Sequence, residues 1–276
     1  MQPSPHTQVP SARLPIRTRA LAARIGFHAS HEQFSPSELL RLVRAAEAAG
    51  FDAAMSSDHF RPWGAAQGHS GFAWSWLGAA MATTGLPMGV ISAPGYRYHP
   101  AIIAQGAATL AEMFPGRFWL ALGSGQRLNE DITGLAWPEK AERNARLREC
   151  ADVIRALLAG EAVTHRGRVT VVEAKLYSRP ERPPPLLGAA VTEATAEQVG
   201  AWADGLLTVS AAPAQLRGSA RPRANRPVWP AGVGLVGSGS KFGFGCARRS
   251  WRGPAGESPV QVRGSARLQR VLRRGR

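Results

Sequence analysis

Short apolar runs alternate with longer amphipathic stretches between residues 24 and 212. Each apolar run has the length of a buried strand, whereas each longer stretch repeats its apolar residues at the three- and four-residue spacing of a helix. The residues expected to form strands are 24–28, 51–55, 87–91, 118–122, 186–190 and 205–209. Those expected to form helices are 36–49, 73–83, 100–114, 138–159 and 193–201, and a hairpin over 163–172 precedes the fifth strand.

This alternation favours a parallel sheet, because consecutive parallel strands need a helical crossover. Two architectures fit, a doubly wound sheet and an eight-stranded barrel. No GxGxxG motif opens the first unit; polar residues instead follow the strands, at Asp58-His59, Ser92 and Ser124. Such positions are expected where strand-to-helix loops build the site of a barrel. We therefore predict an α/β fold, a TIM-type (β/α)8 barrel that is incomplete, with about six recognisable strands.

The periodic pattern ends after Ala212. Residues 213–276 are rich in arginine, glycine, proline and serine, a composition that does not readily bury a core. We divide the chain into an extension (1–23) expected to be disordered, a barrel domain (24–212) and an irregular tail (213–276). The abrupt change also fits out-of-frame translation of a GC-rich gene, a hypothesis that an unshifted reading frame in the resequenced locus would refute.

The positive charge of the chain resides in that tail, which carries +13 of the total of +15. Nucleic-acid binding through the tail is an alternative function, and it would depend steeply on salt. The near-neutral body instead favours an enzyme that acts on a small molecule. No apolar run reaches the length of a membrane span, and the first 22 residues lack the apolar core of a secretory signal. We therefore expect a cytoplasmic protein without a membrane partner.

Metal and disulfide chemistry have little support. Cys150 and Cys246 are the only cysteines and lie in unrelated patterns. His28 and His31 are three residues apart, but no carboxylate or cysteine set accompanies them at ligand spacing. A stronger signal is the strand at 118–122 that runs into Gly123-Ser124-Gly125, because glycines allow a backbone to approach a flat or phosphorylated molecule closely. A plain turn is the alternative.

Three motifs, each at the end of a predicted strand or loop, carry a resemblance to a known family. They are SDHFRPW at 57–63, RYHPAIIAQ at 97–105 and PGRFWLALGSGQRLNE at 115–130. With them the chain resembles, from about Arg24 to Ala212, the luciferase-like flavin and deazaflavin oxidoreductases. The nearest branch contains coenzyme F420-dependent glucose-6-phosphate dehydrogenase and relatives thought to use FMN. The resemblance implies a TIM-type barrel that holds the ring of FMN or F420 at the carboxyl ends of its strands.

The resemblance also implies roles for particular residues. His59 would be the acid or base at the hydride-transfer centre, Asp58 would contact the cofactor, and Trp63 would form the wall on the substrate side. An imidazole titrates near neutrality, so it suits proton transfer; the alternative is that Asp58 and His59 only satisfy loop amides. The other positions implied to contact the cofactor are Val90 and Ile91, which match a non-prolyl cis peptide bulge, together with Ser124, Gly125, Gln126, Asn129, Val191 and Thr192.

Departures from the glucose-6-phosphate enzymes disfavour that substrate. Gln126 stands where they have a glutamate, and an amide cannot exchange a proton. Val209 and Ala212 stand at the threonine and lysine expected to hold the sugar phosphate, and Ala93 replaces a threonine near the deazaflavin. In the loop after the fifth strand, valine and threonine replace two glycines, which slightly favours FMN over F420. A barrel phosphate site, however, commonly uses the loops after strands seven and eight, which are not recognisable here.

We therefore expect hydride transfer, or a monooxygenase variant of it, on a small organic substrate other than glucose 6-phosphate. One alternative is an inactive, truncated barrel, because six strands cannot close an eight-stranded cylinder and would leave edges exposed. The sequence leaves open the substrate, the direction of the reaction, the choice between FMN and F420, and whether the protein forms a homodimer.

Overall fold

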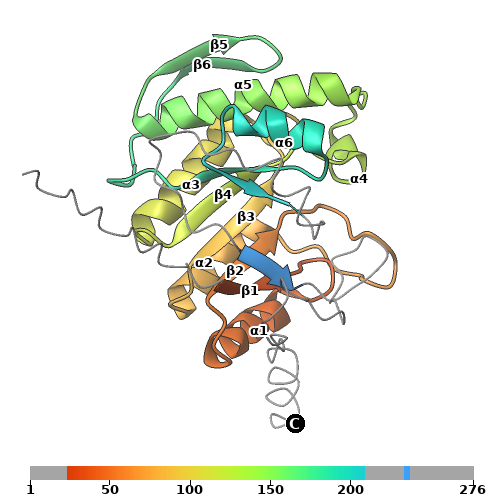
Figure 1. Cartoon of the computed structure of the whole chain (residues 1–276), viewed down its shortest axis with the longest axis vertical. Coiled ribbons are helices and arrows are strands. Elements are labelled where there is room, and N and C mark those ends of the chain that lie inside the picture. Colours follow the sequence, from red (N-terminus) through yellow and green to blue (C-terminus); the bar gives the residue numbers. More distant parts are fainter. Residues whose placement is uncertain (1–23, 209–232, 237–276) are drawn as a thin grey trace, which may run out of the picture.

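A computed structural model of the chain describes residues 24–208 and 233–236, and a seven-stranded sheet runs through its centre (Figure 1). Its strands are β1 (Arg24–Ala29), β2 (Ala53–Ser57), β3 (Met88–Ser92), β4 (Phe118–Leu122), β7 (Leu186–Ala189), β8 (Gly205–Leu207) and β9 (Val233–Val236). Their spatial order is β8-β7-β4-β3-β2-β1-β9, and every neighbouring pair is parallel. All carboxyl ends therefore lie at one edge, where a barrel of this kind builds its site.

Local sequence signals explain where the helices begin and end. The helices are α1 (Pro36–Ala48), α2 (Ala73–Thr83), α3 (Pro100–Met113), α4 (Arg127–Glu130), α5 (Lys140–Ala159) and α6 (Glu193–Gly200), with a 3-10 turn at Asp131–Thr133. The Ser35 hydroxyl accepts a hydrogen bond from the Glu38 amide and caps α1. Gly160 ends α5 with a φ of 96°, a left-handed conformation that glycine adopts without a steric cost. None of the described helices is both long and apolar enough to span a membrane.

A separate hairpin packs along α5 (Figure 1). Its strands β5 (Val163–Arg166) and β6 (Thr170–Ala174) are antiparallel and do not join the main sheet. Glu149 of α5 anchors the hairpin, because its carboxylate lies 2.9 Å from Nε2 of His165 and 2.8 Å from Nη1 of Arg168. The predicted insertion before the fifth strand of the main sheet is thus confirmed.

The core lies on both faces of the sheet. Alternate residues of β4 face opposite sides: Phe118 and Leu120 join the large cluster shared with the helices, whereas Trp119 packs in a smaller cluster with residues of β2 and β8. Gly89 makes room for this tryptophan, since a Cβ at that position would lie 2.0 Å from the indole ring. All five residues of β4 are buried, which explains why its sequence is a continuous apolar run.

The described sheet agrees with the predicted incomplete barrel, with one addition. The strand β9 lies in the segment expected to be irregular, and it pairs with β1 so that Arg24 stands opposite Val233. Four residues that include a glycine are too few to show a period in the sequence, which is why β9 was not predicted. Within the described residues the sheet does not close, because β8 and β9 each pair on one side only. The expectations for 1–23 and for the rest of the tail lie outside the described residues.

Candidate active site

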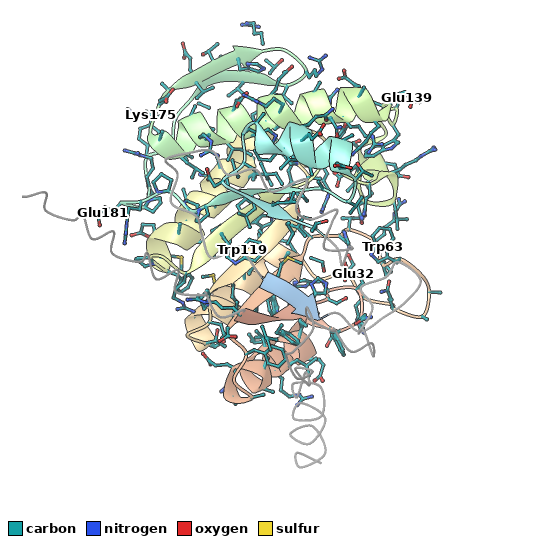
Figure 2. All side chains as sticks on the ribbon, viewed as in Figure 1. Glu32, Trp63, Trp119, Glu139, Lys175 and Glu181 are labelled. Carbon is teal, nitrogen blue, oxygen red and sulfur yellow. The ribbon has the colours of Figure 1, made fainter. Side chains whose placement is uncertain are left out.

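Loops that follow β1, β2 and β4 meet at the carboxyl edge of the sheet. They contribute Ser30 to Glu32 after β1, Asp58 to Trp63 after β2, and Ser124 to Asn129 after β4. Side-chain contacts join the first loop to the second and the second to the third. Figure 2 shows Glu32 and Trp63 on the same side of the sheet. Residues distant in the sequence thus share one edge.

His59 is paired with a buried carboxylate. Nδ1 of His59 contacts Oε1 of Glu32, whose residue is only 2% exposed. The other oxygen of Glu32 accepts hydrogen bonds from the Ser30 hydroxyl at 2.6 Å and from the Ser57 hydroxyl at 3.0 Å. Burial alone would raise the pKa of Glu32, but the hydrogen bonds from His59 and Ser30 outweigh it and lower the pKa to about 2. Glu32 is therefore ionised at neutral pH.

The second ring nitrogen of His59, Nε2, is the one available for proton transfer. Because Glu32 takes Nδ1, Nε2 is the ring nitrogen that can exchange a proton with a substrate. The Trp63 ring stands edge-on to the imidazole, with centroids 5.1 Å apart and planes at 86°. Trp63 is 38% exposed, so its ring borders solvent beside His59, and its role in a substrate wall stays a prediction.

The carboxylate of Asp58 is buried and forms hydrogen bonds with other side chains of the protein. Its residue is 3% exposed, and its carboxylate accepts hydrogen bonds from the Ser92 hydroxyl at 2.6 Å and the Tyr98 hydroxyl at 3.0 Å. Arg97 lies 3.4 Å from the same carboxylate and 3.2 Å from that of Glu130, and it also donates to the backbone carbonyl of Asp58. Burial and the neighbouring Asp58 raise the pKa of Tyr98. The structure places Asp58 in a buried network that fixes the backbone just before His59.

Asn129 likewise acts between loops. Its residue is 2% exposed, and its side-chain oxygen accepts hydrogen bonds from the amides of Phe60 at 2.9 Å and Arg61 at 3.1 Å. An ion pair of 3.0 Å between Arg61 and Asp131 joins the same two segments at the surface. Asn129 therefore holds the loop that carries His59 against the loop that follows β4.

Polar groups of the glycine loop after β4 contact the first turn of α5. Oγ of Ser124 lies 2.7 Å from Nζ of Lys140, and the carbonyl of Gly125 lies 3.5 Å from Nη1 of Arg143. Gly125 has a φ of 76°, in the left-handed region that favours glycine. Gln126 is exposed, so its amide can contact a ligand.

The loop after β7 contributes one exposed and one capping residue. Val191 is 72% exposed. Thr192 is the N-cap of α6, and its hydroxyl accepts a hydrogen bond from the Thr195 amide at 3.3 Å. The two residues therefore border the edge on the side of α6.

The bulge implied by the resemblance at Val90 and Ile91 is absent, because no peptide bond in the described part of the chain is cis. Both residues lie within β3. They continue its parallel register with β2 and β4, where Val90 stands opposite Ser56 and Leu120. Continuous hydrogen bonding to both neighbouring strands keeps β3 extended at these residues. Val90 is fully buried, so its side chain packs in the core.

Two more histidines, His28 and His31, lie close to Glu32, and burial affects both of them. His31 is fully buried, its Nε2 lies 2.8 Å from the Ser56 hydroxyl, and burial lowers its pKa to about 4. Burial also lowers the pKa of His28. Both rings are thus neutral near pH 7. Among the described residues no three His, Cys, Asp or Glu side chains gather as a metal site.

The sequence predicted roles for His59 and Trp63 but did not indicate the buried Glu32 beside His59. Glu32 follows β1 as Asp58 follows β2, so the rule that polar residues gather at strand ends would have found it. Arg97 and Glu130 are 33 positions apart, and only the fold shows that they form a pair.

Comparisons with known proteins agree with the fold and the motifs. Residues 20–226 match the family model of the luciferase-like monooxygenases. The F420-dependent glucose-6-phosphate dehydrogenase of Nakamurella multipartita is 46% identical over 191 residues, which are 68% of this chain and 56% of that protein. The enzyme of the same name from Segniliparus rotundus is 41% identical over 201 residues, or 71% of this chain and 60% of that protein.

A solved structure of an oxidoreductase also matches this fold. An F420-dependent secondary alcohol dehydrogenase in complex with an F420-acetone adduct matches with a TM-score of 0.68 and 38% identity, over 71% of this chain and 61% of that one. The chain spans little more than half the length of the two curated glucose-6-phosphate dehydrogenases named above. The resemblance noted from the motifs is confirmed: the chain belongs to the luciferase-like monooxygenase family.

Proposed function

We propose that the chain is a flavin- or deazaflavin-dependent oxidoreductase that moves a hydride between a small organic substrate and the ring of its cofactor. The observation that carries the proposal is the ionised, buried Glu32 held against His59 at the carboxyl edge, with Trp63 beside it. A carboxylate-supported imidazole at that edge is equipped to exchange a proton. The family match and the relatives' names support the cofactor class.

The residues at the edge fit FMN or F420. Both cofactors carry ring carbonyls and a phosphate, which accept hydrogen bonds. The edge offers donors in the Ser124 hydroxyl, the Gln126 amide and the backbone around Gly125, and the exposed Val191 offers an apolar contact. We propose that these residues and Thr192 hold the cofactor directly, whereas Asp58 and Asn129 support it through the loops that they fix.

His59 would handle the proton of the reaction. Its Nε2 would take the proton of a substrate hydroxyl, and a flavin or deazaflavin held at this edge would supply the hydride acceptor for the carbon. The ionised Glu32 orients the imidazole and stabilises the imidazolium that forms. Trp63 packs edge-on against the ring and excludes water from one side of it.

The substrate proposed is a small alcohol or its ketone rather than glucose 6-phosphate. The relatives' names favour the sugar phosphate. Against it stands the exposed Gln126, whose amide cannot exchange a proton in place of the family's glutamate. The positions of the expected phosphate ligands, 209 and 212, lie outside the described residues. The solved F420-dependent secondary alcohol dehydrogenase, which is in complex with an F420-acetone adduct, supports a simpler substrate.

Titration of the full chain with FMN and with F420, each followed by absorbance and fluorescence, tests the proposal. We expect saturable one-to-one binding of one of the two cofactors. The variant His59→Asn should bind the same cofactor with similar affinity, because His59 serves proton transfer. Binding of neither cofactor would overturn the proposal and favour the inactive barrel.

A further inference from the structure

The backbone of His59 is held on both sides of the residue. The peptide carbonyl before it, that of Asp58, accepts a hydrogen bond from Nη2 of Arg97. The peptide N–H after it, that of Phe60, donates to Oδ1 of Asn129 at 2.9 Å. These two groups belong to the two peptides that flank the Cα atom of His59. Holding both peptides therefore restricts the two backbone rotations that aim the imidazole.

One side chain connects these two anchors. Nε of Arg97 lies 3.2 Å from Oε1 of Glu130, and Glu130 directly follows Asn129 in the short helix α4. Nη1 of Arg97 lies 3.1 Å from the Tyr98 hydroxyl. A guanidinium is planar and its donors have a fixed geometry. Arg97 therefore sets the distance between the loop after β2 and the segment that follows the glycine loop.

Stability alone does not account for this buried group. The side chains of Arg97, Asp58 and Glu130 are 7%, 1% and 2% exposed, so one cation and two carboxyl groups are removed from water. Buried ionic groups of this kind are often no more stabilising than apolar side chains of similar volume, and a role attested for them is to specify one geometry. The geometry specified here is that of the residue between the two anchors, His59.

From this arrangement we infer that Arg97 is a positioning residue for His59 in the proposed reaction. The inference rests on the proposed function, in which His59 exchanges the proton, and it adds the group that aims His59. Arg97 acts through the carbonyl of Asp58, whereas Glu32 holds the imidazole itself at Nδ1. The backbone and the ring of His59 are thus fixed by separate groups.

Three variants of the full chain test the inference. Arg97→Met keeps much of the length of the side chain and removes its donors, whereas Arg97→Lys keeps the charge without the planar fork. Arg117→Met is the matched control. Arg117 also donates to backbone carbonyls, those of Met81, Thr84 and Leu86, but it stands just before β4, at the end of that strand opposite to the site.

The first measurement is hydrogen–deuterium exchange of the protein without cofactor. Arg97→Met should speed exchange of the amides of residues 57–63 and 124–130 by about tenfold to a hundredfold, the value of a hydrogen bond to a charged group. Arg97→Lys should restore part of the protection. Arg117→Met should speed exchange near residues 81–88 and leave the two loops unchanged. Unchanged exchange of the two loops in Arg97→Met would overturn the inference.

The second measurement separates the aim of His59 from stability. With 2-propanol as substrate and the cofactor that binds, Arg97→Met should lower kcat by about 10², the effect of a small misplacement of a reacting group, and keep KM near that of the wild type. Arg97→Lys should recover part of kcat, and Arg117→Met should keep all of it. If kcat of Arg97→Met equals that of the wild type, the inference is wrong while the proposed function stands.

Two further outcomes also decide. If Arg97→Met does not fold, Tyr98→Phe takes its place, because it removes hydrogen bonds to Arg97 and Asp58 without removing a charge; it should speed exchange of both loops by about threefold to tenfold. Where 2-propanol is not oxidised, exchange decides alone: faster exchange in both loops supports the inference, and in one loop or neither overturns it. Failure of both cofactors to bind overturns the proposed function and leaves the exchange result unaffected.

Discussion

Replacing Glu32 by glutamine tests the buried pair on which the proposed chemistry depends. The substitution keeps the shape of the side chain and removes its charge. In the folded protein the pKa of Glu32 falls from the ordinary 4.5 to about 2. At about 1.36 kcal/mol for each pKa unit, this difference corresponds to roughly 3 kcal/mol of folding free energy at neutral pH.

The sign of the pH dependence follows from the direction of the shift. Because the folded state lowers the pKa, the contribution of Glu32 is fully present above pH 4.5 and is lost as the pH falls toward 2. Urea unfolding of the wild type and of Glu32→Gln should therefore differ by about 3 kcal/mol at pH 7, and the two curves should converge at the acid end. Glu38→Gln is the control, since Glu38 pairs with Arg41 at the surface and should change far less.

The same variant has a kinetic consequence. Without the carboxylate the imidazolium of His59 loses its partner, so kcat/KM should fall by about 10² to 10⁴, the usual value of acid–base assistance. A difference in unfolding free energy that is as large at pH 2.5 as at pH 7, together with unchanged kcat/KM, would refute the reasoning.

Three further predictions concern the rest of the site. Arg97→Met leaves Asp58 and Glu130 buried without their cation, so urea unfolding should show a loss of about 3 to 5 kcal/mol; a loss below about 1 kcal/mol would mean that the network matters little. His59→Asn should lower the rate of hydride transfer in stopped-flow measurements by about 10² to 10⁴, and an unchanged rate would exclude His59 as the acid or base. Gln126→Glu should not create glucose-6-phosphate oxidation in a cofactor-reduction assay, and its appearance would contradict the proposed substrate.

The fold was largely predictable because most elements are long or buried on both faces. The strand at 118–122 and the helix at 73–83 have the predicted bounds. The second strand begins two residues later than predicted, because Phe51 packs against Phe27 and Asp52 accepts a hydrogen bond from the Ile25 amide before the strand starts. The helix α4 was not predicted, since four residues complete barely one turn.

The site was predictable only in part. His59 and Trp63 stand in a motif, so the resemblance implied roles for them, and these roles stay predictions. The resemblance implied cofactor contacts for Asp58 and Asn129, whereas the fold buries both side chains and gives each one protein partners. The division of the chain at residue 212 stays a prediction, and the family match extends beyond it to residue 226.

Hydrogen–deuterium exchange of the full chain, with and without a saturating cofactor, tests the central claim most directly. If FMN or F420 binds at the carboxyl edge, amides of residues 58–63 and 123–129 should gain protection, while the hairpin at 163–174 should not change. Protection confined to other segments, or none at saturation, would contradict a cofactor site beside His59 and Glu32.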